Sequence, residues 1–216
     1  MQLYEFGPEA AENVLIQPVG DHDLPLIENE IAEIRRRTEI PFRLTAVKVE
    51  SWNRDLSPWP APAVFGNEGF GDGAAALLRE ILPLCADEGK RYFIGGYSMA
   101  GLFALWSAFQ TEVFSGAAAA SPSMWFPGLM EYLRGSACGC GAVYLSLGNR
   151  EEKTANPVMR TVGDRIREGY ELLRVRGVRC TLEWNSGGHF KEPDLRTAKA
   201  FAWVLENAEE KSLYEG

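Results

Sequence analysis

The chain has 216 residues, which is enough for one domain with a sizeable core, and its hydrophobic content of 46% is normal for a globular protein. Its net charge of −8 argues against nucleic acids and anionic membrane surfaces as partners. No segment approaches 18 consecutive apolar residues, and the N-terminus lacks the pattern of a signal peptide. We therefore expect one domain over residues 1–216, without a membrane span.

Strand-like and helix-like segments alternate along the chain. Apolar alternation or short apolar runs predict strands over residues 13–17, 43–49, 92–94, 115–120, 142–147 and 178–184, with residues 2–6 pairing with the first of these. Helical spacing predicts helices over residues 24–37, 74–85, 101–109, 158–174 and 194–207, the last capped by Asp194. A long loop rich in Pro, Trp and Gly occupies residues 51–73. This alternation predicts an α/β fold with a mostly parallel sheet and helices on both faces.

The junction between the strand at Tyr92–Ile94 and the helix after it holds the most informative motif, Gly96-Tyr97-Ser98-Met99-Ala100. A serine on a sharp strand-to-helix turn needs small residues two positions away on each side, here Gly96 and Ala100. Such a nucleophile elbow exposes the hydroxyl and directs the next N–H, that of Met99, toward a forming oxyanion. An ordinary glycine-rich turn is the alternative.

A base for Ser98 must come from one of two histidines. His189 follows a predicted strand and two glycines, so its loop can fold back over the carboxyl edge of the sheet. His22 lies between two aspartates before the serine, which is typical of a solvated loop residue. We expect His189 to be the base.

A carboxylate that orients the histidine should follow a strand between Ser98 and His189. Glu151 comes three residues after the strand that ends at Gly148 and is our first choice, although the same residues resemble a solvated charge cluster. Glu152, Asp164, Asp194 and a dyad without an acid stay open.

The loop after the strand at residues 43–49 is expected to supply the second oxyanion donor, an N–H near Trp52 or Asn53. Trp52 and Trp59 could form an apolar wall for an acyl or aryl group, or could pin the loop to the core. The spacing of the four cysteines, Cys85, Cys138, Cys140 and Cys180, is not that of a zinc site, so we expect reduced thiols in a cytoplasmic protein. The reaction of a serine hydrolase requires no metal or cofactor, and we expect none.

The chain resembles the esterase D-like family of α/β-hydrolases, over roughly residues 13–205. The similarity rests on the elbow, the loop Trp-Asn-Arg-Asp-Leu-Ser-Pro-Trp, the run Ser121-Pro122-Ser123-Met124-Trp125, Leu-Ser-Leu-Gly followed by Glu-Glu-Lys-Thr, and the late Gly-Gly-His. The family includes siderophore esterases, feruloyl esterases and S-formylglutathione hydrolases. The resemblance implies a serine hydrolase with Ser98 as nucleophile and His189 as base. The chain lacks the insertions that form lids in larger members.

The sequence thus predicts an α/β-hydrolase that cleaves a small-molecule carboxylic ester, with Asn53, Trp59 and Trp125 binding the substrate. Alternatives are an acyltransferase, thioesterase or amidase with the same triad, and a catalytically inactive binding protein with the same fold. The oligomeric state is left open, with a homodimer as one option.

Overall fold

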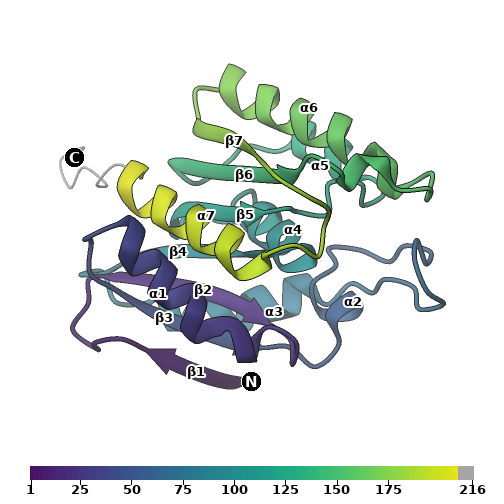
Figure 1. Cartoon of the computed structure of the whole chain (residues 1–216). Helices are drawn as coiled ribbons and strands as arrows, with labels where there is room; N and C mark the ends of the chain where they lie inside the picture. Colours follow the sequence, from purple (N-terminus) through teal and green to yellow (C-terminus); the bar gives the residue numbers. More distant parts are fainter. Residues whose placement is uncertain (209–216) are drawn as a thin grey trace.

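A computed structural model describes residues 1–208, which form one seven-stranded sheet with helices on both faces (Figure 1). The strands are β1 (Gln2–Phe6), β2 (Asn13–Val19), β3 (Phe42–Lys48), β4 (Arg91–Tyr97), β5 (Phe114–Ala120), β6 (Ala142–Gly148) and β7 (Arg179–Asn185). Their order is β1-β3-β2-β4-β5-β6-β7, and every pair is parallel except β1 with β3. The predicted α/β architecture is confirmed.

The helices form two layers. They are α1 (Ile27–Arg37), α2 (Trp52–Asp55), α3 (Ala74–Ile81), α4 (Met99–Ser107), α5 (Leu129–Gly135), α6 (Val162–Val175) and α7 (Pro193–Asn207), with short 3₁₀ turns at Leu24–Leu26, Leu82–Cys85, Glu151–Lys153 and Met159–Thr161. In Figure 1, α1 and α7 lie side by side on one face, and α3, α4, α5 and α6 pack on the other. The predicted long helices are present, and α2 and α5 are additional short ones.

The N-terminal strand differs from the prediction. β1 pairs antiparallel with β3, with Gln2 opposite Lys48, and makes no pair with β2. β2 is buried along its whole length between β3 and β4, whereas β1 is half exposed at the edge of the sheet. The apolar β2 therefore takes an interior position and leaves the edge to β1.

The start of α7 also differs from the prediction, because Asp194 does not cap this helix. Pro193 is the first helical residue, and the cap position belongs to Glu192, which has a positive φ of 52°. The Asp194 carboxylate instead accepts a hydrogen bond of 2.6 Å from Asn29 Nδ2 on α1. Proline suits the first helical position because it has no N–H to satisfy, and this moves the helix start before Asp194.

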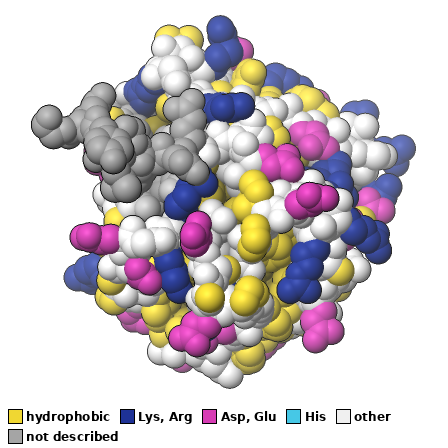
Figure 2. Space-filling model, turned by 90° about the vertical axis from the view of Figure 1, so that its left-hand side faces the viewer, with side chains coloured by type: hydrophobic (Ala, Val, Ile, Leu, Met, Phe, Trp, Pro, Cys, Tyr) yellow, Lys and Arg dark blue, Asp and Glu magenta, His cyan; other side chains and the backbone are white. Residues whose placement is uncertain are grey.

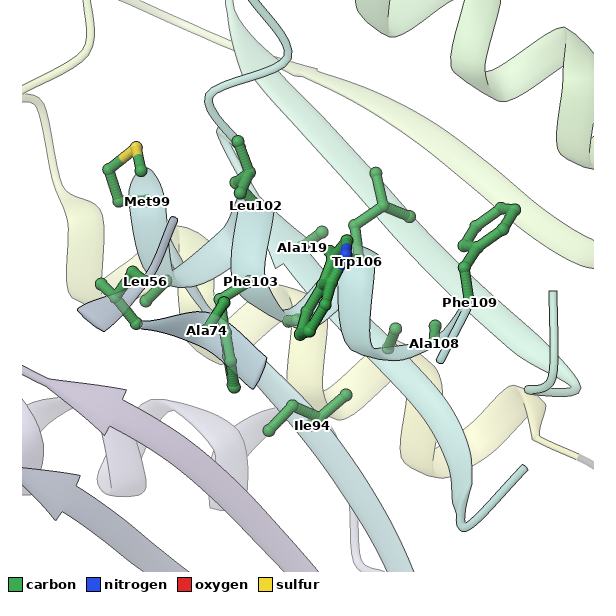
Figure 3. Close-up of a cluster of buried hydrophobic side chains, with 14 of the residues drawn as sticks. Leu56, Ala74, Ile94, Met99, Leu102, Phe103, Trp106, Ala108, Phe109 and Ala119 are labelled. Carbon is green, nitrogen blue, oxygen red and sulfur yellow. The ribbon is translucent and has the colours of Figure 1, made fainter. Parts of the chain in front are cut away.

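The core lies on both faces of the central strands. In Figure 3, Leu102, Phe103 and Trp106 of α4 lie with Ile94 of β4 and Ala119 of β5. All seven residues of β5 are buried, which confirms the predicted strand of small side chains. On the other face, a Cβ added at Gly95 would lie 2.5 Å from the Phe201 ring of α7, so the small residue allows this helix to approach the sheet.

The amino ends of the parallel strands lie together on one side of the molecule. Figure 2 views the molecule from the left of Figure 1, toward the amino ends of these strands, and basic and acidic side chains are interspersed there.

No helix within residues 1–208 is long and apolar enough to cross a membrane. Four cysteines are free thiols, with Cys138 Sγ 3.7 Å from Cys140 Sγ.

Candidate active site

Ser98 occupies a strained turn between β4 and α4. Its φ of 59° and ψ of −116° are unusual for a residue with a side chain, and α4 begins at the next residue, Met99. A Cβ added at Gly96 would lie 2.6 Å from the Cβ of Ala100. The turn therefore requires small residues on both sides of the serine, and it has the strand–turn–helix geometry of a nucleophile elbow.

His189 lies beside this serine. It sits in the loop between β7 and α7, and its Nε2 is 2.9 Å from Ser98 Oγ. Its Nδ1 is 2.7 Å from Glu151 Oε2, so the imidazole bridges the hydroxyl and a carboxylate. This arrangement lets the ring accept the Ser98 proton at Nε2 while Nδ1–H donates to the carboxylate.

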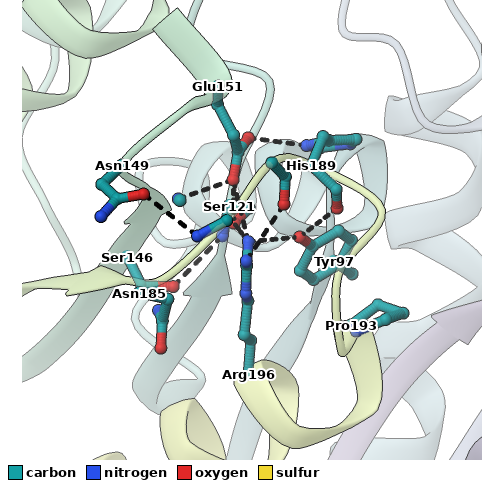
Figure 4. Close-up of polar contacts among 12 residues, drawn as sticks. Tyr97, Ser121, Ser146, Asn149, Glu151, Asn185, His189, Pro193 and Arg196 are labelled. Atoms are coloured by element: carbon teal, nitrogen blue, oxygen red, sulfur yellow. Dashed lines mark hydrogen bonds and ion pairs between the residues drawn. The ribbon is translucent and has the colours of Figure 1, made fainter.

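The Glu151 carboxylate is held from several directions (Figure 4). It follows β6 in the turn Glu151–Lys153, and its side chain is only 4% exposed. Oε1 accepts hydrogen bonds from Gly148 N at 2.7 Å, Ser121 Oγ at 2.9 Å and an Arg196 nitrogen at 3.0 Å. The positive charge of Arg196 compensates for the burial of this carboxylate.

The other acids considered from the sequence lie elsewhere. Glu152 pairs with Arg167 at 3.1 Å on the surface, Asp164 is 92% exposed, and Asp194 contacts Asn29. Among these acids, Glu151 alone is within hydrogen-bond distance of His189. The structure thus brings together Ser98, His189 and Glu151.

Arg196 of α7 is part of this network and was not expected from the sequence. It is 2% exposed, and its second terminal nitrogen donates to the carbonyls of Ser186 and Gly188, in the loop that leads to His189. Figure 4 places it between Glu151 and Tyr97. Helical spacing offered one signal for its burial, because Arg196 precedes Ala200 and Val204 by four and eight residues and so shares the buried face of this helix.

Tyr97 fixes the backbone of the histidine itself. Its hydroxyl donates a hydrogen bond of 2.6 Å to the carbonyl of His189 and accepts one of 3.0 Å from Arg196. Burial, reinforced by the charge of Glu151, raises the pKa of Tyr97 to about 12. The hydroxyl therefore stays protonated near neutral pH and remains a donor.

An apolar cavity of about 530 Å³ opens over Ser98 and His189. Its aromatic wall comes from separate parts of the chain and consists of Trp52, Phe65, Trp125 and Phe190. Leu26, Phe65 and Phe190 are among the most exposed large hydrophobic side chains in residues 1–208, and all three line this cavity. Apolar surface that gathers around one cavity is typical of a ligand site.

Two of the residues predicted to bind substrate do not line this cavity. Trp59 Nε1 donates to the carbonyl of Pro127 at 2.8 Å, and its ring packs on Phe126 and Tyr132, so it pins the long loop to the core. Asn53 is buried within α2, where its carbonyl accepts a hydrogen bond from Ser57 Oγ. Trp125 does line the cavity.

Two loops border the cavity next to Ser98: the loop after β2 and the loop after β3. Trp52 borders the cavity at the start of α2, and its ring meets His22 edge-to-face at 4.7 Å between centroids. The strand beside β4 is β2 rather than β3, so the loop of Gly20–Asp23 leaves the sheet directly next to the elbow. His22 thus lines the cavity, although it does not contact Ser98 in the way that His189 does.

No group of three or more His, Cys, Asp or Glu side chains is arranged to hold a metal ion in the part of the chain that the structure describes. The polar groups of Ser98, His189 and Glu151 form a continuous chain of hydrogen-bond contacts. The site can therefore activate a hydroxyl group for attack on a carbonyl.

Comparison with known proteins finds solved structures of similar fold. No protein-family model and no curated protein matches this chain. The siderophore hydrolase EstA from Aspergillus nidulans superimposes with a TM-score of 0.66 at 20% identity, over 94% of this chain and 86% of that one. An IroE-like serine hydrolase from Shewanella oneidensis gives 0.62 at 17%, over 95% and 73%. The enterobactin esterase Fes from Shigella flexneri, in the presence of 2,3-dihydroxy-N-benzoyl-glycine, gives 0.65 at 16%, over 94% and 55%.

At these identities the similarity concerns the fold, and it extends over nearly the whole described chain. The mostly parallel seven-stranded sheet with helices on both faces is the one found in these esterases. The chain has the α/β-hydrolase fold of siderophore esterases, as the sequence motifs predict.

Proposed function

We propose that this protein is a serine hydrolase that cleaves a small-molecule carboxylic ester, with Ser98 as nucleophile, His189 as general base and Glu151 as the orienting acid. The observation that carries the proposal is the continuous path from Ser98 Oγ through both nitrogens of His189 to Glu151. Each step of this path is within hydrogen-bond distance.

The reaction follows from that path. His189 Nε2 takes the proton of Ser98 as Oγ attacks the ester carbonyl, and the N–H of Met99, with a second N–H from Trp52 or from the loop after β2, holds the oxyanion. His189 then passes the proton to the departing alcohol oxygen. Water, activated by the same imidazole, hydrolyses the acyl-enzyme and frees the carboxylic acid.

Labelling with a fluorophosphonate probe, followed by peptide mapping, tests the nucleophile. We expect one labelled serine, Ser98, and no label in Ser98→Ala, whereas Ser136→Ala, a change away from the cavity, labels normally.

Ester hydrolysis should fall by about 10³-fold or more in Ser98→Ala and in His189→Ala. The double variant should be little worse than either, because residues acting as one unit are non-additive.

A folded protein that is not labelled, or a Ser98→Ala variant that keeps its turnover, would contradict the proposal.

We also infer a reducing, cytoplasmic location, which the four free thiols support.

A further inference from the structure

A second, smaller cavity of about 240 Å³ adjoins the cavity over Ser98. Four residues line both cavities: Trp125, Met159, His189 and Phe190. Ser98 lines only the larger cavity, whereas Arg150 and Lys153 line only the smaller one. The two spaces therefore meet at His189 and differ in the side chains that surround their far ends.

The two cavities also differ in charge. Asp23, the carboxylate of the larger cavity, accepts a hydrogen bond from Gly20 N and lies 3.4 Å from His22. In the smaller cavity, the carboxylate of Glu151 is held by Arg196 and His189. Each cavity thus contains one carboxylate with hydrogen-bond or ion-pair partners, so the difference in charge comes from the cationic side chains.

Arg150 and Lys153 of the smaller cavity differ from these carboxylates, because neither cationic side chain makes an ion pair or hydrogen bond with another part of residues 1–208. Glu152, which lies between them in the sequence, is directed to Arg167 instead. Two positive charges are thus left without a partner at this cavity, in a chain whose net charge is −8. Cations with free donors beside an active site attract an anionic part of the substrate.

The chemistry assigns each cavity to one half of an ester. The acyl group becomes attached to Ser98, so it occupies the cavity that Ser98 lines. His189 Nε2, which lies 2.9 Å from Ser98 Oγ, delivers a proton to the leaving alcohol oxygen, so that oxygen lies beside the imidazole ring. Because His189 lines both cavities, the rest of the alcohol can extend past the ring into the smaller cavity. The volume of that cavity is below the range of about 300–1,000 Å³ for pockets that hold a whole ligand, so it suits a fragment.

We propose, on the basis of the proposed function, that the substrate is an ester of an apolar or aromatic carboxylic acid with a small hydroxy acid, whose free carboxylate is bound by Arg150 and Lys153. Ser98 Oγ forms the new acyl bond while the bond to the alcohol oxygen breaks. The Ser98 proton reaches that oxygen through His189, and the hydroxy acid is released with its carboxylate unchanged.

The test compares two esters that differ in one charge, O-benzoylglycolate and its neutral amide, O-benzoylglycolamide. We expect kcat/KM to be at least about tenfold higher for the carboxylate ester, chiefly through a lower KM. In Arg150→Gln/Lys153→Gln this preference should fall to about one. The control variant Arg79→Gln/Lys90→Gln removes the same two charges away from both cavities and should keep the preference.

A preference near one in the unchanged protein, or one that survives in Arg150→Gln/Lys153→Gln, would overturn the inference while hydrolysis of both esters continued. A preference for the carboxylate on the acyl side, seen with monoethyl succinate against ethyl succinamate, would overturn the assignment of the cavities. If neither benzoyl ester were cleaved and Ser98 stayed unlabelled, the proposed function itself would fail.

Discussion

At the scale of single residues, the Glu151 carboxylate joins the candidate active site to the stability of the fold. Oε2 faces His189, and Oε1 accepts hydrogen bonds from Gly148, Ser121 and Arg196. Removing its charge would affect both partners, because the histidine would lose its orienting anion and Arg196 would be left as a buried cation without compensation.

We therefore expect Glu151→Gln to lower kcat by at least about tenfold and the free energy of unfolding by about 3 kcal/mol. Glu152→Gln is the matched control, because its carboxylate makes a partly exposed pair with Arg167, worth about 0–1 kcal/mol. Steady-state kinetics and urea denaturation of both variants check this. Equal, near-normal values for the two would point to a Ser98–His189 dyad.

The sequence was sufficient to predict Ser98, His189 and Glu151 as candidates, because each follows a predicted strand and the carboxyl ends of parallel strands meet at one edge. Ser121 and Tyr97, which hold this group in place, could not be predicted in this way. Their hydrogen bonds depend on side-chain directions that no spacing along the chain fixes.

At the scale of elements, the contact between β4 and α7 brings Ser98 and the His189 loop to the same edge of the sheet. A Cβ added at Gly95 would lie 2.5 Å from Phe201 of α7 and 2.8 Å from the Cβ of Ala118 on β5. Both distances are shorter than real Cβ contacts, and buried strands on both sides leave little room for adjustment.

We expect Gly95→Ala to reduce the free energy of unfolding by about 1–3 kcal/mol and to lower activity, since α7 leads directly from the histidine loop. Gly135→Ala at the end of α5 is the control, because a Cβ there meets nothing within 4 Å. Urea denaturation with an esterase assay of each variant measures both effects. A Gly95→Ala variant as stable as Gly135→Ala would contradict this packing.

Periodicity predicted the long elements well, but not the partners of the edge strand. Residues 2–6 alternate like many strands, and nothing within them selects β3 over β2 as a neighbour. That choice is made by the interior strands, because the fully buried β2 must be covered on both sides. The short helices α2 and α5 likewise have too few residues for a periodic pattern.

At the scale of the whole molecule, a buried acid on α1 couples folding to pH. Glu30 is 3% exposed, and its Oε2 accepts a hydrogen bond of 3.3 Å from Gln17 Nε2. Its other oxygen, Oε1, is buried without a hydrogen-bond partner in residues 1–208. Burial raises the pKa of Glu30 well above its usual value, and the negative charges of Asp23 and Asp194 add to this rise.

The sign of the effect follows from proton binding. Above the ordinary pKa of about 4.3, an unfolded chain releases the Glu30 proton while the folded chain keeps it. The folded state then binds more protons than the unfolded state, so the free energy of unfolding falls as pH rises, until the raised folded-state pKa is reached. The slope from this one group is at most about 1.4 kcal/mol per pH unit.

Glu30→Gln removes that titration and keeps the shape of the side chain. We expect the variant and the unchanged protein to unfold with similar free energies near pH 4, and the variant to become increasingly more stable by comparison as pH rises toward 8. Urea denaturation at several pH values measures this difference. Glu28→Gln is the control, because it changes an exposed carboxylate on the same helix. The free energy of unfolding of this variant should follow the same dependence on pH as that of the unchanged protein. A constant difference between Glu30→Gln and the unchanged protein at every pH would mean that Glu30 is ionised within the fold, with its charge compensated by a neighbour.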